Sequence, residues 1–181
     1  LWVTIPEGLR LWQNNRYELP PFQHPALRFP ARNVELLPES VGGGMVIALR
    51  GGGLLIRDKN GLFTHLTVRE GLTSNVMMEL DVAPTGVIYD ASNTGLNIIR
   101  PQLGGIWRIE TLTTKHGLPS NQVNDVTWLG DEIWVATDHG IARFRKKPQS
   151  APMPVPIFEK LVVNNQNIGL TDNQQLAHDQ N

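Results

Sequence analysis

The chain repeats one short pattern four times, and this repeat limits the possible fold more than any other feature of the 181 residues. In each copy a large apolar residue stands six positions before a glycine, and Leu or Ile follows that glycine. The copies are WVTIPEGL (2–9), IALRGGGL (47–54), YDASNTGL (89–96) and WVATDHGI (134–141). Their glycines, Gly8, Gly53, Gly95 and Gly140, are 45, 42 and 45 residues apart. A period of this length is typical of propeller blades.

Each copy has the features of antiparallel strands. The apolar runs are short, end at turn residues and are rich in Val, Ile, Trp and Tyr, which favours strands over helices. The glycine permits the positive φ of a tight hairpin, and NN at 14–15, NG at 60–61 and GG at 104–105 predict further turns. Another strand is expected to begin at Val34, Val76 and Val123. We therefore predict an all-β fold, a β-propeller fragment built from four-stranded antiparallel blades.

The position of the repeat in the chain predicts the number of blades. The chain starts at the second strand of one repeat, and the last repeat reaches its third strand at Phe144 before RKKPQSAPMPVP (145–156), whose four prolines interrupt strand pairing. We expect two complete and two partial blades over 1–145 and a semi-rigid linker over 146–156. Upstream repeats are expected to complete the ring and to supply the strand missing after Phe144.

Composition excludes several classes of function. Sixteen Lys and Arg balance seventeen Asp and Glu without a run of either sign, so we expect neither nucleic acid nor an anionic membrane as a partner. Cysteine is absent, which excludes disulfides, thiolate metal sites and cysteine nucleophiles. No apolar run approaches the roughly 18–20 residues of a membrane-spanning helix, so this segment is expected to make no membrane contact.

The best copy of the repeat, GLPSNQVNDVTWLGDEIWVATDHGIARF (117–144), resembles the two-component regulator propeller repeat, which occurs in extracytoplasmic sensor regions of bacterial hybrid two-component systems and related histidine kinases. The resemblance extends with decreasing clarity over residues 1–145. The first copies depart from it, because PARNV replaces the Gly-Leu-Pro-Ser-Asn turn near Asn33 and GGG replaces the polar hairpin at 51–53. IFEKLVVNNQNI (157–168) looks like the opening of the three-tyrosine immunoglobulin-like domain of this family, so 157–181 are expected to begin a β-sandwich.

The resemblance implies a role for the parent protein. This segment is expected to sense an oligosaccharide, another nutrient cue or a small molecule on the periplasmic side of the inner membrane, without a cofactor. The signal is expected to pass through the β-sandwich and a membrane helix to a histidine kinase, in a parent that forms a homodimer. No part of the kinase lies in these residues, so the segment itself is not expected to be an enzyme. The alternatives are a protein-interaction propeller without a small-molecule ligand and a propeller glycosidase or lyase.

The strand order predicts where a ligand would bind. The four hairpin turns are expected to share one rim with the loops GLTSN (71–75) and GLPSN (117–121), in which Gly71 and Gly117 permit the chain reversal. Candidate ligand-binding residues on this rim are Arg50, Asn75, Asn93, Asn121, Asp138 and His139. An Asn that closes a turn more often bonds its own backbone than a ligand, and a solvated turn is the commoner role for Arg50. Asp138 and His139 have no further ligand at metal spacing, so no metal is expected.

The remaining candidates are aromatic and acidic. Tryptophans can stack on sugar rings, but in strands of a repeat they more often belong to the blade core; these are Trp2, Trp107, Trp128 and Trp134, with Trp12 harder to place. A paired-carboxylate glycosidase would need acidic residues that meet around the propeller axis. The candidates are Glu35, Glu70, Asp81, Asp90 and Asp125, and nothing in the sequence singles out a pair, so no catalytic residue is assigned.

Overall fold

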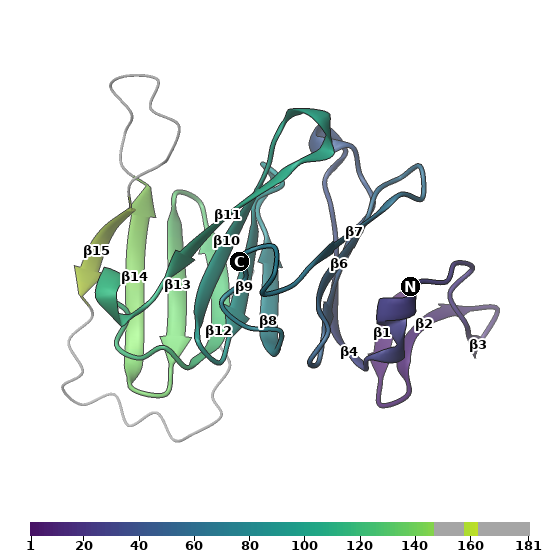
Figure 1. Ribbon diagram of the computed structural model, residues 1–181, viewed down its shortest axis with the longest axis horizontal. Coiled ribbons are helices and arrows are strands. Elements are labelled where there is room, and N and C mark those ends of the chain that lie inside the picture. Colours follow the sequence, from purple (N-terminus) through teal and green to yellow (C-terminus); the bar gives the residue numbers. More distant parts are fainter. Residues whose placement is uncertain (147–157, 163–181) are drawn as a thin grey trace.

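In the computed structural model, which describes residues 1–146 and 158–162, the strands form four antiparallel sheets that follow one another in chain order (Figure 1). Each sheet is a meander in which neighbouring strands are also neighbours in sequence. The first sheet has three strands, β1 (Trp2–Ile5), β2 (Gly8–Gln13) and β3 (Arg16–Glu18). Gly8 begins β2, as Gly53 and Gly95 begin the third strands β6 and β10 of the next two sheets, so β1 and β2 match the second and third strands of a blade.

The second and third sheets are complete four-stranded blades. The second contains β4 (Ala31–Leu36), β5 (Met45–Leu49), β6 (Gly53–Arg57) and β7 (Phe63–Leu66). The third contains β8 (Met77–Val82), β9 (Ile88–Ser92), β10 (Gly95–Pro101) and β11 (Trp107–Leu112). Both agree with the blades that the repeat predicts.

The fourth sheet corrects one prediction. It contains β12 (Val123–Leu129), β13 (Glu132–Thr137), β14 (Gly140–Lys146) and β15 (Phe158–Val162). The prediction that this blade stops at its third strand is wrong, because β15 pairs antiparallel with β14 and occupies the edge expected for a strand from the start of the propeller. The proline segment separates the two strands in sequence, but pairing satisfies the backbone groups along the edge of β14. The rest of the predicted linker and sandwich lies outside the described residues.

The helical elements of the described residues are short 3-10 turns in the connections: η1 (Pro25–Arg28), η2 (Glu39–Val41), η3 (Leu103–Gly105) and η4 (Thr114–His116). None of the described helices has the length and apolar character needed to cross a bilayer.

Three apolar clusters lie between successive blades and hold them together. The cluster between the first two blades includes Leu9 and Leu55, the next includes Leu54 and Ile99, and the last includes Leu96 and Val135. Burying one such side chain stabilises the fold by about 1.5–3 kcal/mol. Every residue of β5 and β9 is buried because blades cover both faces, whereas β13 alternates between buried and half-buried. The continuous apolar runs of the middle blades thus reflect two-sided packing.

The hairpin glycines have the predicted backbone conformation. The values of φ are +114° at Gly8, +74° at Gly53, +149° at Gly95 and +122° at Gly140. At Gly53 an added Cβ would lie 2.2 Å from the carbonyl oxygen of Leu66, far closer than a contact distance. The outer strand β7 can therefore pass beside the hairpin only if this residue has no side chain.

The first strands of successive blades lie next to one another and form the inner wall of the arrangement, since β4 contacts β8 and β8 contacts β12. Each has a β-bulge at the same place in the repeat, between Ala31 and Asn33, between Met77 and Glu79, and between Val123 and Asp125. A bulge changes the direction of the side chains that follow it. The bulges therefore position Asn33, Glu79 and Asp125 equivalently along the wall.

Candidate functional site

The hairpin turns after β1, β5, β9 and β13 and the loops between blades lie at one end of the sheets, which we call the turn rim. Each loop is bonded to the turns beside it. The amide of Gly53 donates to the carbonyl oxygen of Asn75 at 3.1 Å, and the hydroxyl of Thr94 donates to the carbonyl oxygen of Thr73 at 2.8 Å. In the last blade the amide of Asp138 donates to the carbonyl oxygen of Gln122 at 3.2 Å. The expected common rim is therefore present.

The two Gly-Leu-x-Ser-Asn loops use their asparagines in the same way. The side-chain oxygen of Asn75 accepts from the amide of Val68 at 2.9 Å, and that of Asn121 accepts from the amide of Thr114 at 2.7 Å. Each bond closes the loop on its own backbone. Asn75 and Asn121 thus stabilise turns, which is the commoner role of asparagine at such positions.

The serines and leucines of these loops are also structural. The hydroxyl oxygens of Ser74 and Ser120 each accept from the backbone amide two residues later, at 2.9 and 3.1 Å. Leu72 and Leu118 are 4% exposed and belong to the clusters between blades. Gly71 and Gly117 have φ of +112° and +100° at the reversals. The five-residue motif is therefore a structural joint between blades.

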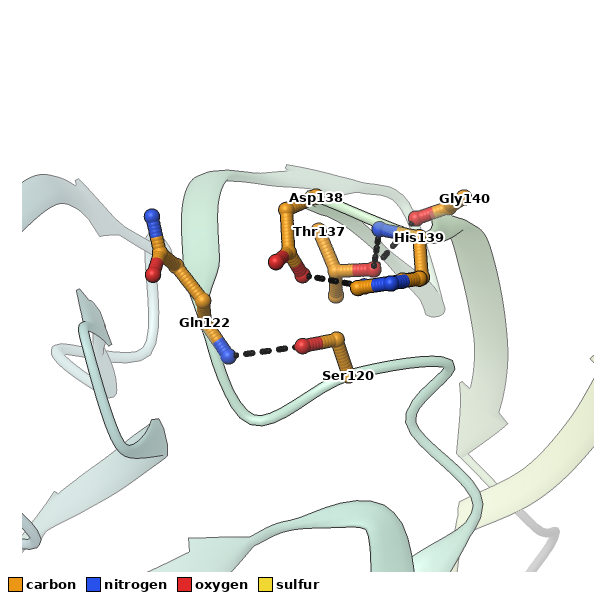
Figure 2. A network of polar contacts seen from close by, with 6 residues as sticks. All are labelled: Ser120, Gln122, Thr137, Asp138, His139 and Gly140. Atoms are coloured by element: carbon orange, nitrogen blue, oxygen red, sulfur yellow. Dashed lines mark hydrogen bonds and ion pairs between the residues drawn. The ribbon is translucent and has the colours of Figure 1, made fainter.

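Asp138 and His139 belong to a network of polar contacts on the turn rim (Figure 2). The Nδ1 atom of His139 lies 2.9 Å from Oδ1 of Asp138. Thr137 closes the hairpin, since its hydroxyl donates to the carbonyl oxygen of Gly140 at 2.8 Å and accepts from the amide of His139 at 3.2 Å (Figure 2). Hydrogen bonds from Ser120 and from His139 lower the pKa of Asp138. A carboxylate and an imidazole are thus exposed side by side at a rigid turn.

This cluster does not have the geometry of a serine hydrolase. Ser120 and His139 are both held by Asp138 and not by one another, whereas a triad needs the imidazole between the hydroxyl and the carboxylate. Within residues 1–146 and 158–162, no group of three or more His, Cys, Asp or Glu side chains could hold a metal ion.

Arg50 and Asn93 are two further exposed candidates on the rim, and Asn121, described above, is also exposed. Arg50 pairs through its backbone with Val76 in an isolated bridge and donates its amide to the carbonyl oxygen of Pro30 at 2.9 Å. Asn93 occupies the hairpin turn between β9 and β10. Both side chains are positioned by ordered backbone at the turns of neighbouring blades.

The acidic candidates separate into three environments. Glu70 caps its own loop by accepting from the amide and hydroxyl of Thr67 at 2.8 and 2.6 Å, and Asp90 is fully buried inside the third blade. Of the five acidic residues proposed from the sequence to meet around the axis, only Glu35, Asp81 and Asp125 lie on the inner strands.

Glu79 completes this wall and was missed in the sequence. Its Oε1 atom accepts a hydrogen bond from Nδ2 of Asn33 in the preceding blade. Burial raises the pKa of Glu79, and the charges of Asp125 and Asp81 raise it further, while a backbone hydrogen bond from Leu80 and the charge of Arg32 lower it. The one signal in the sequence is that Asn33, Glu79 and Asp125 are each 46 residues apart. That spacing indicates equivalent positions in three blades only once the bulges in their strands are known.

Two inner-wall carboxylates, those of Glu79 and Asp81, make contacts between blades. Oδ2 of Asp81 accepts from the backbone amide of Trp128 in the next blade at 2.5 Å, and Arg32 donates to the carbonyl oxygen of Met78. These contacts give the inner strands a structural role.

The tryptophans have two kinds of surroundings. Trp2, Trp107 and Trp128 pack against the apolar clusters, as expected for blade core. Trp134 lies on β13 with the guanidinium of Arg143 5.3 Å from its ring centroid, and Trp12 packs on Tyr17 with ring centroids 4.7 Å apart. The first three are half-buried and belong to the packing between blades.

No protein-family model matches the sequence, and no curated protein matches it. Among solved structures, the fold is similar to that of the "extracellular domain of the putative hybrid two component system BT3049 from B. thetaiotaomicron". The TM-score is 0.64 and the sequence identity is 19%, over a match that covers 78% of this chain and 19% of the other chain. At this identity the match shows a shared fold alone, in keeping with the four successive antiparallel sheets of this chain.

Proposed function

We propose that this chain is a segment of an extracytoplasmic ligand-sensing propeller in a two-component sensor. The similarity to the extracellular domain of a hybrid two-component system is the observation that supports this most directly. The chain spans about a fifth of the length of that domain, which fits one part of a larger propeller. The segment has a binding role in this proposal, and the parent's kinase is a separate part.

The proposed ligand is an oligosaccharide or another nutrient cue bound at the turn rim. Asn75 and Asn121 are committed to their own loops, so the exposed groups that remain are Arg50, Asn93, Asp138 and His139. A guanidinium, an amide, a carboxylate and an imidazole together provide the donors and acceptors that sugar hydroxyls require. The signal then passes through the predicted sandwich and a membrane helix to the histidine kinase of a periplasmic, dimeric receptor.

Calorimetry with a panel of oligosaccharides tests this function. We expect one class to bind with saturation, and Asp138→Asn together with His139→Gln to weaken that binding by about tenfold, the effect of losing one charged hydrogen bond. Arg108→Gln is the matched control because Arg108 is an exposed residue of β11 outside the turn rim. Absence of binding across the panel, or equal weakening by the control, contradicts the proposal.

One observation favours the second candidate, a protein-interaction propeller. The turns between third and fourth strands, away from the turn rim, expose apolar side chains: Leu62 is 72% exposed, Leu103 97% and Ile106 65%. Exposed apolar residues on neighbouring blades are typical of protein contacts. Replacing Leu103 and Ile106 with Ser should leave saccharide binding unchanged if the first function holds, and should abolish capture of a protein partner if the second holds.

A further inference from the structure

A pocket of about 390 Å³ opens on the turn rim of the first blade. It lies between the hairpin after β1 and the connection from β3 to η1, and it is lined by residues 7–10 together with 19, 20, 22–24 and 27. Its volume falls in the range of small-molecule sites, roughly 300–1,000 Å³. None of the six ligand-binding candidates from the sequence lines it.

The pocket exists because the outer strand of the first blade is short. In the second blade β7 reaches Leu54, directly after the hairpin glycine, and in the third β11 reaches Leu96 in the same way. In the first blade β3 stops opposite Leu11, so the start of β2 has no outer strand beside it. The first copy of the repeat thus has a shorter outer strand, which leaves an open space beside the start of β2.

Glycine contacts show the same difference between blades. A Cβ added to Gly53 or Gly95 would meet a carbonyl oxygen of the outer strand at 2.2 or 2.7 Å. At Gly8 the nearest atom would be Nη1 of Arg10 at 3.8 Å. The connection over residues 19–30 also lacks the Gly-Leu-x-Ser-Asn turn whose leucine is buried between the later blades.

Two hydrogen-bond donors line this space. Nη1 of Arg10 donates to the carbonyl oxygens of Leu9 at 2.9 Å and Glu7 at 3.5 Å, which leaves Nε and Nη2 without a hydrogen-bond partner among residues 1–146 and 158–162. Nδ1 of His24 accepts from the amide of Ala26 at 3.1 Å, so the neutral ring carries its proton on Nε2. Burial and the nearby His65 lower the pKa of His24 and favour that neutral form.

The remaining lining is apolar and well supported. The ring centroid of Phe22 lies 5.5 Å from that of Trp2 and 5.7 Å from that of Phe63. The guanidinium of Arg57 lies 4.7 Å from the Phe22 ring centroid. Leu9, Leu19, Pro20 and Leu27 complete the apolar wall, with Gln23 as a further polar residue. Glu7 is exposed in the hairpin and adds one negative charge to the single positive charge of Arg10.

We propose that this pocket binds a small monocarboxylate with an apolar body. Arg10 and Nε2 of His24 hold the carboxylate, and the apolar part lies against Phe22 and Leu27. Among the lining residues one guanidinium, that of Arg10, is opposed by one carboxylate, that of Glu7, while Arg57 lies against the ring of Phe22 and does not line the pocket. This lining favours one negative charge over two, which disfavours phosphate dianions. The inference goes beyond the sensing role, because the pocket can be occupied whether or not the turn rim binds a saccharide.

Two isosteric probes test the site in the whole chain. Amide chemical shifts are followed by NMR during titration with 3-phenylpropionate and, separately, with the neutral 3-phenylpropionamide. We expect saturable shifts at the amides of residues 7–10, 22–24, 26 and 27, with 3-phenylpropionamide bound about tenfold more weakly because it lacks the charge-assisted hydrogen bonds. Equal affinity for both probes, or shifts confined to other regions, overturns the proposal.

Two substitutions should act in opposite directions. Arg10→Gln should remove the preference for the acid, while Glu7→Gln should strengthen binding of the acid severalfold and leave the amide unchanged. Arg69→Gln, at an exposed arginine of the next loop between blades, is the matched control and should bind both probes as the unmodified chain does. If Arg10→Gln fails to fold, Glu7→Gln decides, and an unchanged or weaker affinity for the acid in that variant counts against the site.

Discussion

Asn97 donates from Nδ2 to Oδ2 of Asp90 at 2.6 Å in the interior of the third blade, where both residues are 0% exposed. The side-chain oxygen of Asn97 accepts in turn from the amide of Thr73 in the loop between blades, at 3.0 Å. Oδ1 of Asp90 is buried without a hydrogen-bond partner among the described residues. The corresponding cross-strand pair in the second blade is Ile47 and Leu55, so a polar pair replaces an apolar one.

Stability should fall with rising pH because of Asp90. Burial raises its pKa well above the ordinary value of 3.8, and the hydrogen bond from Asn97 opposes this only in part. The folded state therefore holds the proton more tightly than the unfolded state. The resulting stability is complete below the unfolded pKa and is lost as pH rises through the folded pKa.

Asp90→Asn tests this pH dependence because it removes the ionisation and keeps the shape of the side chain. Relative to the unmodified chain, the free energy of unfolding of the variant should rise with pH by at most about 1.4 kcal/mol per pH unit. Urea unfolding between about pH 4 and pH 7 measures the difference. Asp131→Asn, in the exposed turn before β13, is the control and should follow the unmodified chain. Parallel pH curves for Asp90→Asn and the unmodified chain would show that Asp90 is not the cause.

The loop asparagine should matter for stability. Asn121→Ala removes the acceptor for the amide of Thr114 and should lower the free energy of unfolding by about 1 kcal/mol. Hydrogen exchange of the Thr114 amide should become faster in the same variant. Asn93→Ala is the matched control, since Asn93 is exposed at a neighbouring turn, and it should change stability by less than about 0.5 kcal/mol. A larger loss from Asn93→Ala than from Asn121→Ala would contradict the assigned roles.

Two glycines with nearly the same φ should respond differently to alanine. Gly53 has φ of +74° and an added Cβ would lie 2.2 Å from the carbonyl oxygen of Leu66, whereas Gly104 has φ of +78° and nothing within 4 Å. Gly104→Ala should cost about 1 kcal/mol, the penalty of the backbone conformation alone. Gly53→Ala should cost at least about 2 kcal/mol more, because β7 must move away from the hairpin. Equal melting temperatures for the two variants would show that the contact at Gly53 relaxes without cost.

The sequence predicted the fold at the level of the repeat. Neighbouring residues specify backbone conformation and the alternation of apolar and polar side chains. These local properties were enough to predict the four hairpin glycines, the paired turn residues and the strands that contain Val34 and Val123. The same reasoning predicted the turn role of Asn75 and Asn121, which their bonds to Val68 and Thr114 confirm. It failed at β15, because pairing across the proline segment depends on an available strand edge and not on local pattern.

Local order and long-range position therefore have different origins in this protein. The sequence by itself determined the all-β class, the blade period and the hairpin turns, since strand alternation and glycine at positive φ act over a few residues. Only the tertiary structure decided that Glu79 meets Asn33, that Asp90 is buried beside Asn97, and that a pocket opens beside Arg10. Those relationships arise when strands of one blade or of adjacent blades pack together, and packing is set by shape and burial that no short stretch of the chain contains.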